Sequence, residues 1–186
     1  MDRKSHSIVV RNFYSPGLSS LMVKYFKENL SFGFAPSLGK KGEMGLENYC
    51  FKTMLFTSVD HQGAGCLYIV IKRILEGMAA DKQVEAILLC RNNAKLVFEW
   101  KPCEDDRMRA YLSIHKNNKV ITFLFGINEI KVTENGETVK KVVQSALIAF
   151  LKVIEGYLIT NGADEHIRKQ SEEMPKPLQE PSPESQ

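Results

Sequence analysis

The sequence predicts an α+β fold of two ββββα repeats, with antiparallel sheets and with helices packed on one face. Three observations predict it: runs of strand-like segments that each end in one helix, an internal similarity at a spacing of 66 residues, and a hydrophobic content of 44% beside 25% charged residues. We expect one domain over residues 1–163, built from repeats at about 19–80 and 84–160, and a tail over residues 164–186.

The first repeat is expected to open with a β-hairpin, and an additional strand at residues 8–14 precedes it. The second strand of the hairpin is residues 30–36, which read L-x-F-x-F-x-P after a polar turn at 27–29. Because proline has no N–H for a ladder, we expect this strand to end at Pro36. Three elements follow: a loop at 37–43, a strand at 49–56, and a helix over about 60–80 with apolar residues at helical spacing.

The second repeat begins with a similar hairpin. Residues 96–102 read L-x-F-x-W-x-P, 66 positions after 30–36, and the match extends upstream without a gap. The two helices align at an offset of 80, which predicts about fourteen extra residues, at 126–139, between this sheet and its helix. The remaining elements are strands at 109–115 and 119–125 around an Asn117-Asn118 turn, and a helix over about 137–159 that ends at Asn161-Gly162.

The C-terminal tail differs in composition from the body. Residues 164–186 hold six acids and three bases, a net charge of −3, which leaves +6 on residues 1–163. Four prolines and few apolar residues follow Glu173, so we expect an acidic, Pro-rich, disordered tail. Two interpretations stay open: a solvated tail without a role, or an acidic arm that visits the basic body or a partner.

Several classes of function are not expected. No apolar run approaches the ~20 residues that span a bilayer, and the polar start is no signal peptide. No Cys-x-x-Cys pair is present, so we expect no metal, and no cofactor is expected either. The leaderless start favours reduced thiols and an intracellular protein, cytoplasmic or nucleoid-associated and not secreted. The cluster at residues 58–61 (Ser-Val-Asp-His) has catalytic residue types, but a helix N-cap at Ser58 or Asp60 explains it, so no enzyme is expected.

The order of elements resembles that of the Whirly single-stranded DNA binders, the related mitochondrial RNA-binding proteins and the PUR repeat proteins, over about residues 19–160. Residues 30–39 (LSFGFAPSLG) are similar to the aromatic-proline-glycine strand end of a Whirly first repeat, and the Phe56-Thr57-Ser58 exit into a helix is similar as well. The resemblance implies a non-enzymatic binder of single-stranded nucleic acid, with DNA favoured over RNA. It also implies a homo-oligomer, a dimer or tetramer, as do the long amphipathic helices.

Strand alternation separates two faces of the second sheet. Leu96, Phe98 and Trp100 are expected to pack under the helices, although a base-stacking role for the two aromatic residues stays open. The opposite face is expected to be basic and aromatic, as single-strand binders require, because cations track phosphates while aromatic rings stack on bases. The candidate nucleic-acid-binding residues are Lys40, Lys41, Lys52, Lys95, Lys101, Arg109, Tyr111, His115 and Lys116.

Alternatives to this interpretation remain. The face is also consistent with an ordinary solvated sheet surface, since Glu99 and the acids at 104–106 dilute its charge. The loop Gly39-Lys40-Lys41-Gly42 either grips a backbone phosphate or forms a flexible turn. A protein-interaction or assembly module on the same scaffold, without nucleic acid, is the second functional hypothesis.

Overall fold

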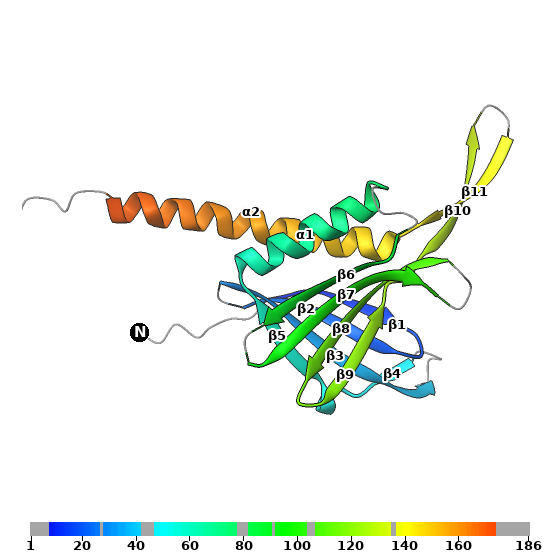
Figure 1. The fold of residues 1–186 in the computed structure, drawn as a ribbon, viewed down its shortest axis with the longest axis horizontal. Coiled ribbons are helices and arrows are strands. Elements are labelled where there is room, and N and C mark those ends of the chain that lie inside the picture. Colours follow the sequence, from blue (N-terminus) through cyan, green and yellow to red (C-terminus); the bar gives the residue numbers. More distant parts are fainter. Residues whose placement is uncertain are drawn as a thin grey trace, which may run out of the picture.

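Two antiparallel sheets, a two-stranded arm and two helices make up the described part of the chain, which confirms the α+β class (Figure 1). The computed structural model describes residues 8–26, 28–41, 47–77, 82–90, 92–103, 107–134 and 137–173. Within these ranges the side chains of residues 8, 9, 26, 40, 41, 47, 134 and 161–173 are not described.

Sheet 1 has the strand order β1-β2-β3-β5, and a short strand β4 pairs with the far end of β3. Sheet 2 has the order β6-β7-β8-β9. The bounds in sheet 1 are β1 (Ile8–Ser15), β2 (Ser19–Phe26), β3 (Asn29–Lys41), β4 (Glu47–Tyr49) and β5 (Leu55–Val59), with a 3-10 turn η1 (Phe51–Thr53) between β4 and β5. Those in sheet 2 are β6 (Val84–Cys90), β7 (Ala94–Pro102), β8 (Met108–Lys116) and β9 (Lys119–Leu124).

Helix α1 (His61–Leu75) follows sheet 1, and helix α2 (Ser145–Glu173) ends the described chain. Asp60 caps α1, because its Oδ1 accepts a hydrogen bond of 2.9 Å from the N–H of Gly63. This geometry confirms the capping interpretation of the Ser-Val-Asp-His cluster. Between β9 and α2 the chain forms a separate hairpin, β10 (Asn128–Glu134) and β11 (Glu137–Val143), hereafter the arm.

The predicted hairpins are confirmed, and so is the core-facing side of their apolar residues. The turn residues Asn92 and Asn93 have φ of 65° and 53°, and Asn117 and Asn118 have φ of 51° and 59°. Two successive positive φ values are typical of the tight turns whose twist matches paired strands, and asparagine tolerates them. The turns fix the register, so that Phe98 of β7 lies opposite Leu112 of β8 and both point into the core.

The correspondence between the repeats differs from the predicted one. Each sheet has four successive main strands followed by a helix only when β1 is counted in the first repeat. The strand expected as an addition at residues 8–14 is therefore the first strand of that repeat. The spacing of 66 residues aligns β3 with β7, although β3 is the third strand of sheet 1 and β7 is the second strand of sheet 2. The two sequences are similar because both strands are central and both turn alternate apolar residues toward the core.

Pro36 does not end its strand, unlike Pro102, where β7 ends. The carbonyl of Pro36 points away from β2 and accepts a hydrogen bond from the N–H of Cys50. In a strand the N–H and the carbonyl of one residue point to the same side, so the N–H that Pro36 lacks would also point away from β2. The ladder from β3 to β5 ends at Phe34 opposite Leu55, so no carbonyl of β5 lies where that donor would be needed. The pairing with β2 continues, because the N–H of Ser37 donates to Leu18 at 2.9 Å.

Three other boundaries were predicted wrongly. The expected strand at 49–56 is broken by η1, and β5 instead runs to Val59. The extra residues expected at 126–139 form the arm, which extends into the segment expected as the start of the second helix. That helix begins at Ser145 and continues through Asn161-Gly162 to Glu173, because good helix formers follow and one interior glycine costs only about 1 kcal/mol. Residues 164–173 are thus helical, whereas the tail at 174–186 lies outside the described residues.

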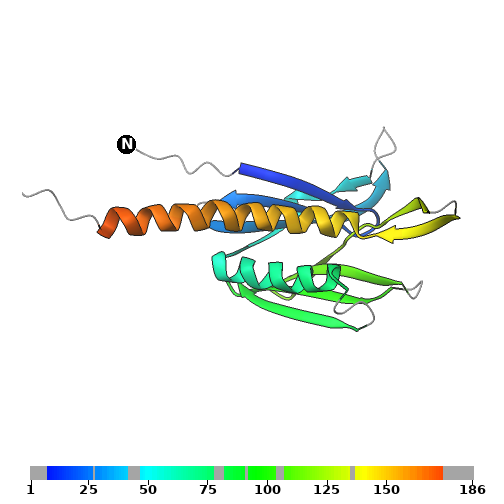
Figure 2. The same ribbon diagram turned by 90° about the horizontal axis from the view of Figure 1, so that it is seen from above.

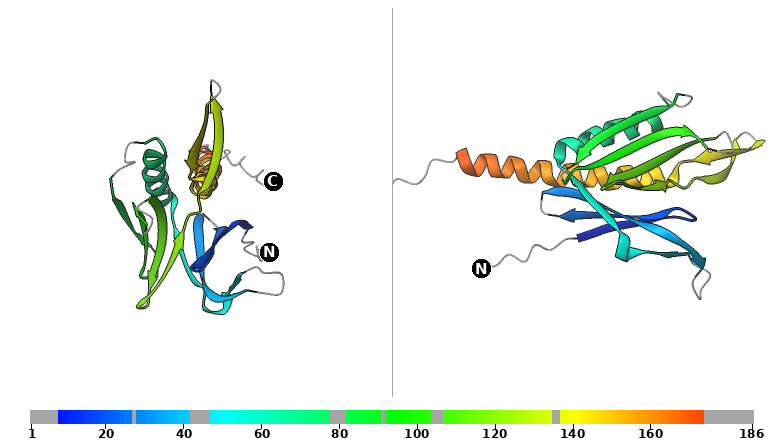
Figure 3. Two further views of the ribbon diagram at one scale, coloured as in Figure 1. Left: turned by 90° about the vertical axis from the view of Figure 1, so that its right-hand side faces the viewer. Right: turned by 60° about the horizontal axis from the view of Figure 1, so that its bottom comes forward.

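One hydrophobic core joins both repeats. Figures 2 and 3 show α2 lying over sheet 1 and α1 over sheet 2, so the repeats exchange their helices. The ring of Phe150 on α2 lies 5.9 Å from that of Phe13 in β1 and 6.0 Å from that of Phe32 in β3. Hydrogen bonds fix the same contact, since the hydroxyl of Tyr157 donates to the Glu28 carbonyl at 2.6 Å.

Candidate nucleic-acid interface

The outer face of sheet 2 carries five of the predicted residues together. Cross-strand register places Lys101 beside Arg109, and Lys95 beside His115, at opposite ends of this face. Tyr111 lies between these rows, opposite Glu99. The predicted alternation is therefore correct for these five side chains, which lie on the sheet face turned away from the core.

Acids and apolar side chains interrupt the positive charge of that face. The Nζ of Lys101 lies 2.7 Å from the Oε1 of Glu99, and the same ammonium lies 5.1 Å from the Tyr111 ring centroid. Glu85 is directly opposite Glu99 in the register. The row of Lys95 and His115 also holds Leu89, which is 81% exposed. The face is amphipathic, and the cation beside its tyrosine is already neutralised.

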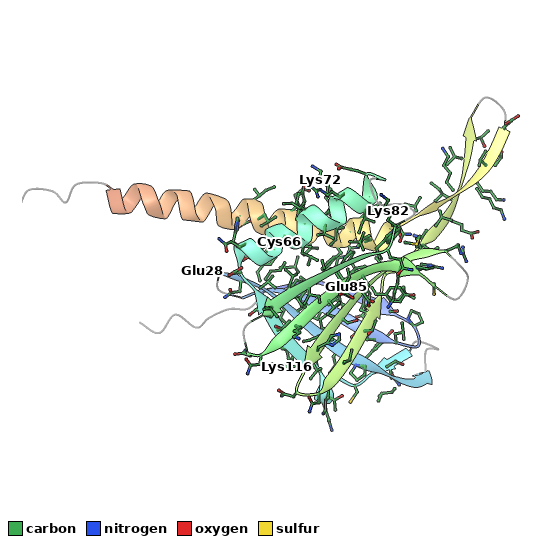
Figure 4. The ribbon with its side chains drawn as sticks, in the orientation of Figure 1. Glu28, Cys66, Lys72, Lys82, Glu85 and Lys116 are labelled. Carbon is green, nitrogen blue, oxygen red and sulfur yellow. The ribbon has the colours of Figure 1, made fainter. Side chains whose placement is uncertain are left out.

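Lys116 was assigned to the wrong face. It has the same strand parity as Leu112 and Ile114, so it points to the core side of sheet 2, where it lies at the strand end and reaches sheet 1. Its ammonium donates a hydrogen bond of 2.9 Å to the carbonyl of Phe56 in β5. Figure 4 shows Lys116 at the end of sheet 2 that lies farthest from the arm.

The remaining predicted lysines belong to sheet 1. Lys52 is exposed but lies in η1, not on a strand, so the alternation on which its assignment rested does not apply. Lys40 and Lys41 belong to β3 by their backbone, which corrects the expected loop, and their side chains lie outside the described residues. None of the three shares a strand with the sheet 2 residues.

A hollow of about 310 Å³ lies where the edge strand β5 of sheet 1 meets the turn end of sheet 2. We name it the junction pocket. Sheet 1 contributes its outer face, and sheet 2 contributes one turn residue and one strand end. The lining residues are Lys24, Ser31, Phe56, Thr57, Ser58, Asn92 and Lys116.

Phe56 is the aromatic centre of the junction pocket. It lies opposite Gly33 in the register, and a Cβ at Gly33 would come within 2.7 Å of the Phe56 ring. The absence of a side chain at Gly33 therefore lets the ring approach the backbone of β3 closely. The ring is nevertheless 45% exposed, so one side rests on the sheet while part of it stays open to solvent.

The charge around this ring is positive. The Nζ of Lys24 lies 5.6 Å from the ring centroid, and Lys116 binds the backbone of the same residue. The register places Lys24, Ser31 and Ser58 in one row across the outer face of sheet 1. Among the lining residues there are two lysines and no acid. Burial raises the pKa of the Cys90 thiol.

Two further aromatic rings extend the outer face of sheet 1. Tyr14 of β1 is 58% exposed, and its ring lies 5.6 Å from that of Tyr49 in β4. Together with Phe56 they give this face three rings outside the core. The arrangement combines aromatic, cationic and hydroxyl groups on one surface, which suits an unpaired nucleotide strand.

Sequence reasoning missed most of this surface, namely Tyr14, Lys24, Ser31, Tyr49, Phe56, Ser58 and Asn92. One signal was present: Gly33 stands between two core phenylalanines of an alternating strand, and a glycine there marks close approach of another group. The partner ring was not readable, because η1 interrupts the segment before β5 and so hides which of its residues face outward.

The described residues form neither a metal site nor a membrane-spanning helix. No group of three or more His, Cys, Asp or Glu there is placed to hold a metal ion. In the same part of the chain, no helix has the length and apolar character needed to cross a bilayer. The four cysteines are free thiols.

No protein-family model and no curated protein matches the sequence. Among solved structures, the chain is similar to that described as the structure of the plant transcriptional regulator PBF-2. The likeness covers 95% of this chain and 99% of the other, with 12% identity and a TM-score of 0.40. At these values it establishes neither a shared family nor a shared function.

Proposed function

We propose that this protein binds single-stranded nucleic acid, without catalysis, across the outer face of sheet 1. One base stacks on Phe56, while Lys24 and Lys116 hold the neighbouring phosphates. The observation that carries this proposal is the half-exposed ring of Phe56, which lies between two lysines in a hollow free of acids among its lining residues.

The chemistry favours an unpaired strand. Stacking a base on an aromatic side chain contributes about 1–3 kcal/mol and does not depend strongly on the base. A paired base has no free face to offer a ring on a sheet surface, so a duplex gains only the phosphate contacts. Because the Phe56 ring already packs closely against Gly33, little side-chain freedom is lost on binding.

Of the two kinds of strand, we favour DNA because of the resemblance of residues 30–39 to the Whirly single-stranded DNA binders. Hydroxyl and amide groups in the junction pocket, from Ser31, Ser58 and Asn92, are able to hydrogen-bond to the sugar of either nucleic acid. Matched DNA and RNA oligonucleotides of one sequence test the preference directly.

The location that we infer is inside the cell, in the cytoplasm or on the nucleoid.

The binding test compares the wild-type protein with Phe56→Ala by fluorescence anisotropy of a labelled single-stranded oligonucleotide. Loss of one stacked base predicts about a 5- to 150-fold weaker Kd. Phe51→Ala is the matched control, since that ring is 55% exposed on η1 and lies outside the junction pocket. Equal effects of the two variants, or no binding by the wild-type protein at low salt, would refute the proposal.

Charge variants separate the two candidate faces. Lys24→Gln and Lys116→Gln should each reduce the slope of log K against log salt by about 0.7, the value for one phosphate on a single strand. The double variant Lys101→Ala with Arg109→Ala should leave Kd nearly unchanged. If that double variant weakens binding while Phe56→Ala does not, the interface lies on the outer face of sheet 2 instead.

We also infer that the protein is a homo-oligomer, a dimer or tetramer. The helix layer keeps three isoleucines at least 41% exposed, namely Ile69 on α1 and Ile148 and Ile159 on α2. Apolar side chains gathered on one layer favour a partner surface. Light scattering at micromolar concentration is the measurement, and a monomer mass there would contradict the inference.

A further inference from the structure

The arm projects away from the sheets and helices, as Figures 1 and 3 show. Two-stranded hairpins are marginally stable in water when nothing covers them. The base of this one is nevertheless fixed to the body. Arg107 pairs with Glu129 at 3.2 Å, and the side-chain amide of Asn128 donates to the Ser145 hydroxyl at 2.8 Å. The arm therefore has a defined direction where it leaves the body.

The two faces of the arm differ in chemistry. One face carries Ile130, Val132 and Val139, with Lys141 opposite Ile130. The other face carries Glu129 opposite Val142 at the base of the arm, where Arg107 already pairs with that carboxylate. Beyond this row, Lys131 lies directly opposite Lys140, and Thr133 lies directly opposite Thr138. We name the outer part of this second face, defined by Lys131, Lys140, Thr133 and Thr138, the cationic face of the arm.

The lysine pair is an unfavourable one in the unbound protein. Like charges directly opposite on one sheet face destabilise the pairing of the strands. Both lysines are exposed, and among the described residues no ion pair neutralises either of them. In the adjacent row the two threonine hydroxyls lie 3.0 Å apart. Lysine and threonine are both side chains that contact phosphate oxygens in nucleic-acid complexes.

We propose that the cationic face of the arm is a second nucleic-acid contact, which binds the phosphodiester backbone through Lys131 and Lys140. An anion between the two ammonium groups converts their mutual repulsion into two attractions, and the threonine row offers hydroxyl donors beside it. The face has no aromatic ring, so it holds phosphates without selecting bases. This inference rests on the proposed function, because it extends the same ligand to a separate element.

The test uses the full-length double variant Lys131→Gln with Lys140→Gln. With a single-stranded oligonucleotide long enough to reach both sites, the salt slope should fall by about 1.4, twice the value for one phosphate. Lys141→Gln is the matched control, since it lies on the same strand but on the opposite face of the arm. It should leave the slope unchanged. The melting temperature should not fall in the double variant, because a repulsive pair is removed.

A duplex probe distinguishes failure of this inference from failure of the proposed function. Phosphate contacts do not require an unpaired base, so weak duplex binding at low salt should also decrease in the double variant. If Phe56→Ala has no effect but the arm variant still lowers the salt slope for both the single strand and the duplex, only the assignment of the junction pocket is refuted. If Phe56→Ala weakens binding and the arm variant matches wild type, the arm inference is refuted. A change of oligomeric mass in the arm variant, without a change in slope, would also refute it and assign this face to protein contact.

Discussion

Replacing Phe98 with alanine tests which face of sheet 2 packs against the core. The Phe98 side chain is fully buried on β7, with Ala86 and Leu112 as its cross-strand neighbours. Removing the ring loses about 1.5–3 kcal/mol of transfer free energy. A cavity term adds to this loss, because paired strands on both sides prevent the site from collapsing, and the total is about 3–5 kcal/mol.

For a chain of this length, 1 kcal/mol lowers Tm by about 2–4 °C, so Phe98→Ala should lower it by about 6–20 °C. Thermal unfolding followed by circular dichroism measures this shift. Phe51→Ala, at an exposed ring, should stay within about 0.5 kcal/mol of the wild-type protein. If Phe98→Ala leaves Tm unchanged but abolishes oligonucleotide binding, the sheet is reversed and its aromatic row is the binding platform.

Two further substitutions test single hydrogen bonds. Asp60→Ala should cost about 0.5–2 kcal/mol in urea unfolding, because the N–H of Gly63 loses its acceptor; Asp60→Asn keeps an acceptor, and an equal loss there would contradict the capping role. Tyr157→Phe should cost about 0.5–1.5 kcal/mol, since the bond to the Glu28 carbonyl is removed. Burial raises the pKa of Tyr157 from the usual tyrosine value of 10.0. The neutral hydroxyl therefore stabilises the folded state fully below pH 10.0. This contribution is lost as the pH rises through the raised pKa of the folded state. Stability measured from pH 8 to 11 should therefore fall less steeply in Tyr157→Phe, and an unchanged slope would contradict this.

The local part of the fold was predictable from the sequence. The alternation over residues 96–102 and 109–115 predicts β7 and β8, and the paired asparagines at 117–118 predict the turn from β8 to β9. Turn and hydrophobic period agree there, so this part of sheet 2 was predictable from local sequence. Pro36 shows where local reasoning fails. Whether a missing N–H matters depends on which strand lies beside it, and that is decided by the tertiary pairing of β3 with β5.

The candidate site was less predictable than the fold. Lys95, Lys101, Arg109, Tyr111 and His115 follow from the alternation of two strands, and the structure brings them to one face. The junction pocket combines side chains from both repeats, such as Lys24 and Lys116. The residue spacing within one strand does not predict that side chains of two sheets line one pocket, because their proximity depends on how the two sheets cross.

The exchange of helices between the repeats has a consequence for synthesis on the ribosome. The apolar face of sheet 1 is complete once β5 has emerged, yet α2, which covers it, is made after all the other described elements. Contacts such as the bond from the Tyr25 hydroxyl to the Val153 carbonyl span 128 residues. Contacts of this sequence separation raise the contact order, and the nascent chain exposes an uncovered sheet 1 until α2 has been made. We therefore expect the nascent protein to need rapid synthesis of α2, or a chaperone that covers the apolar face of sheet 1 until then.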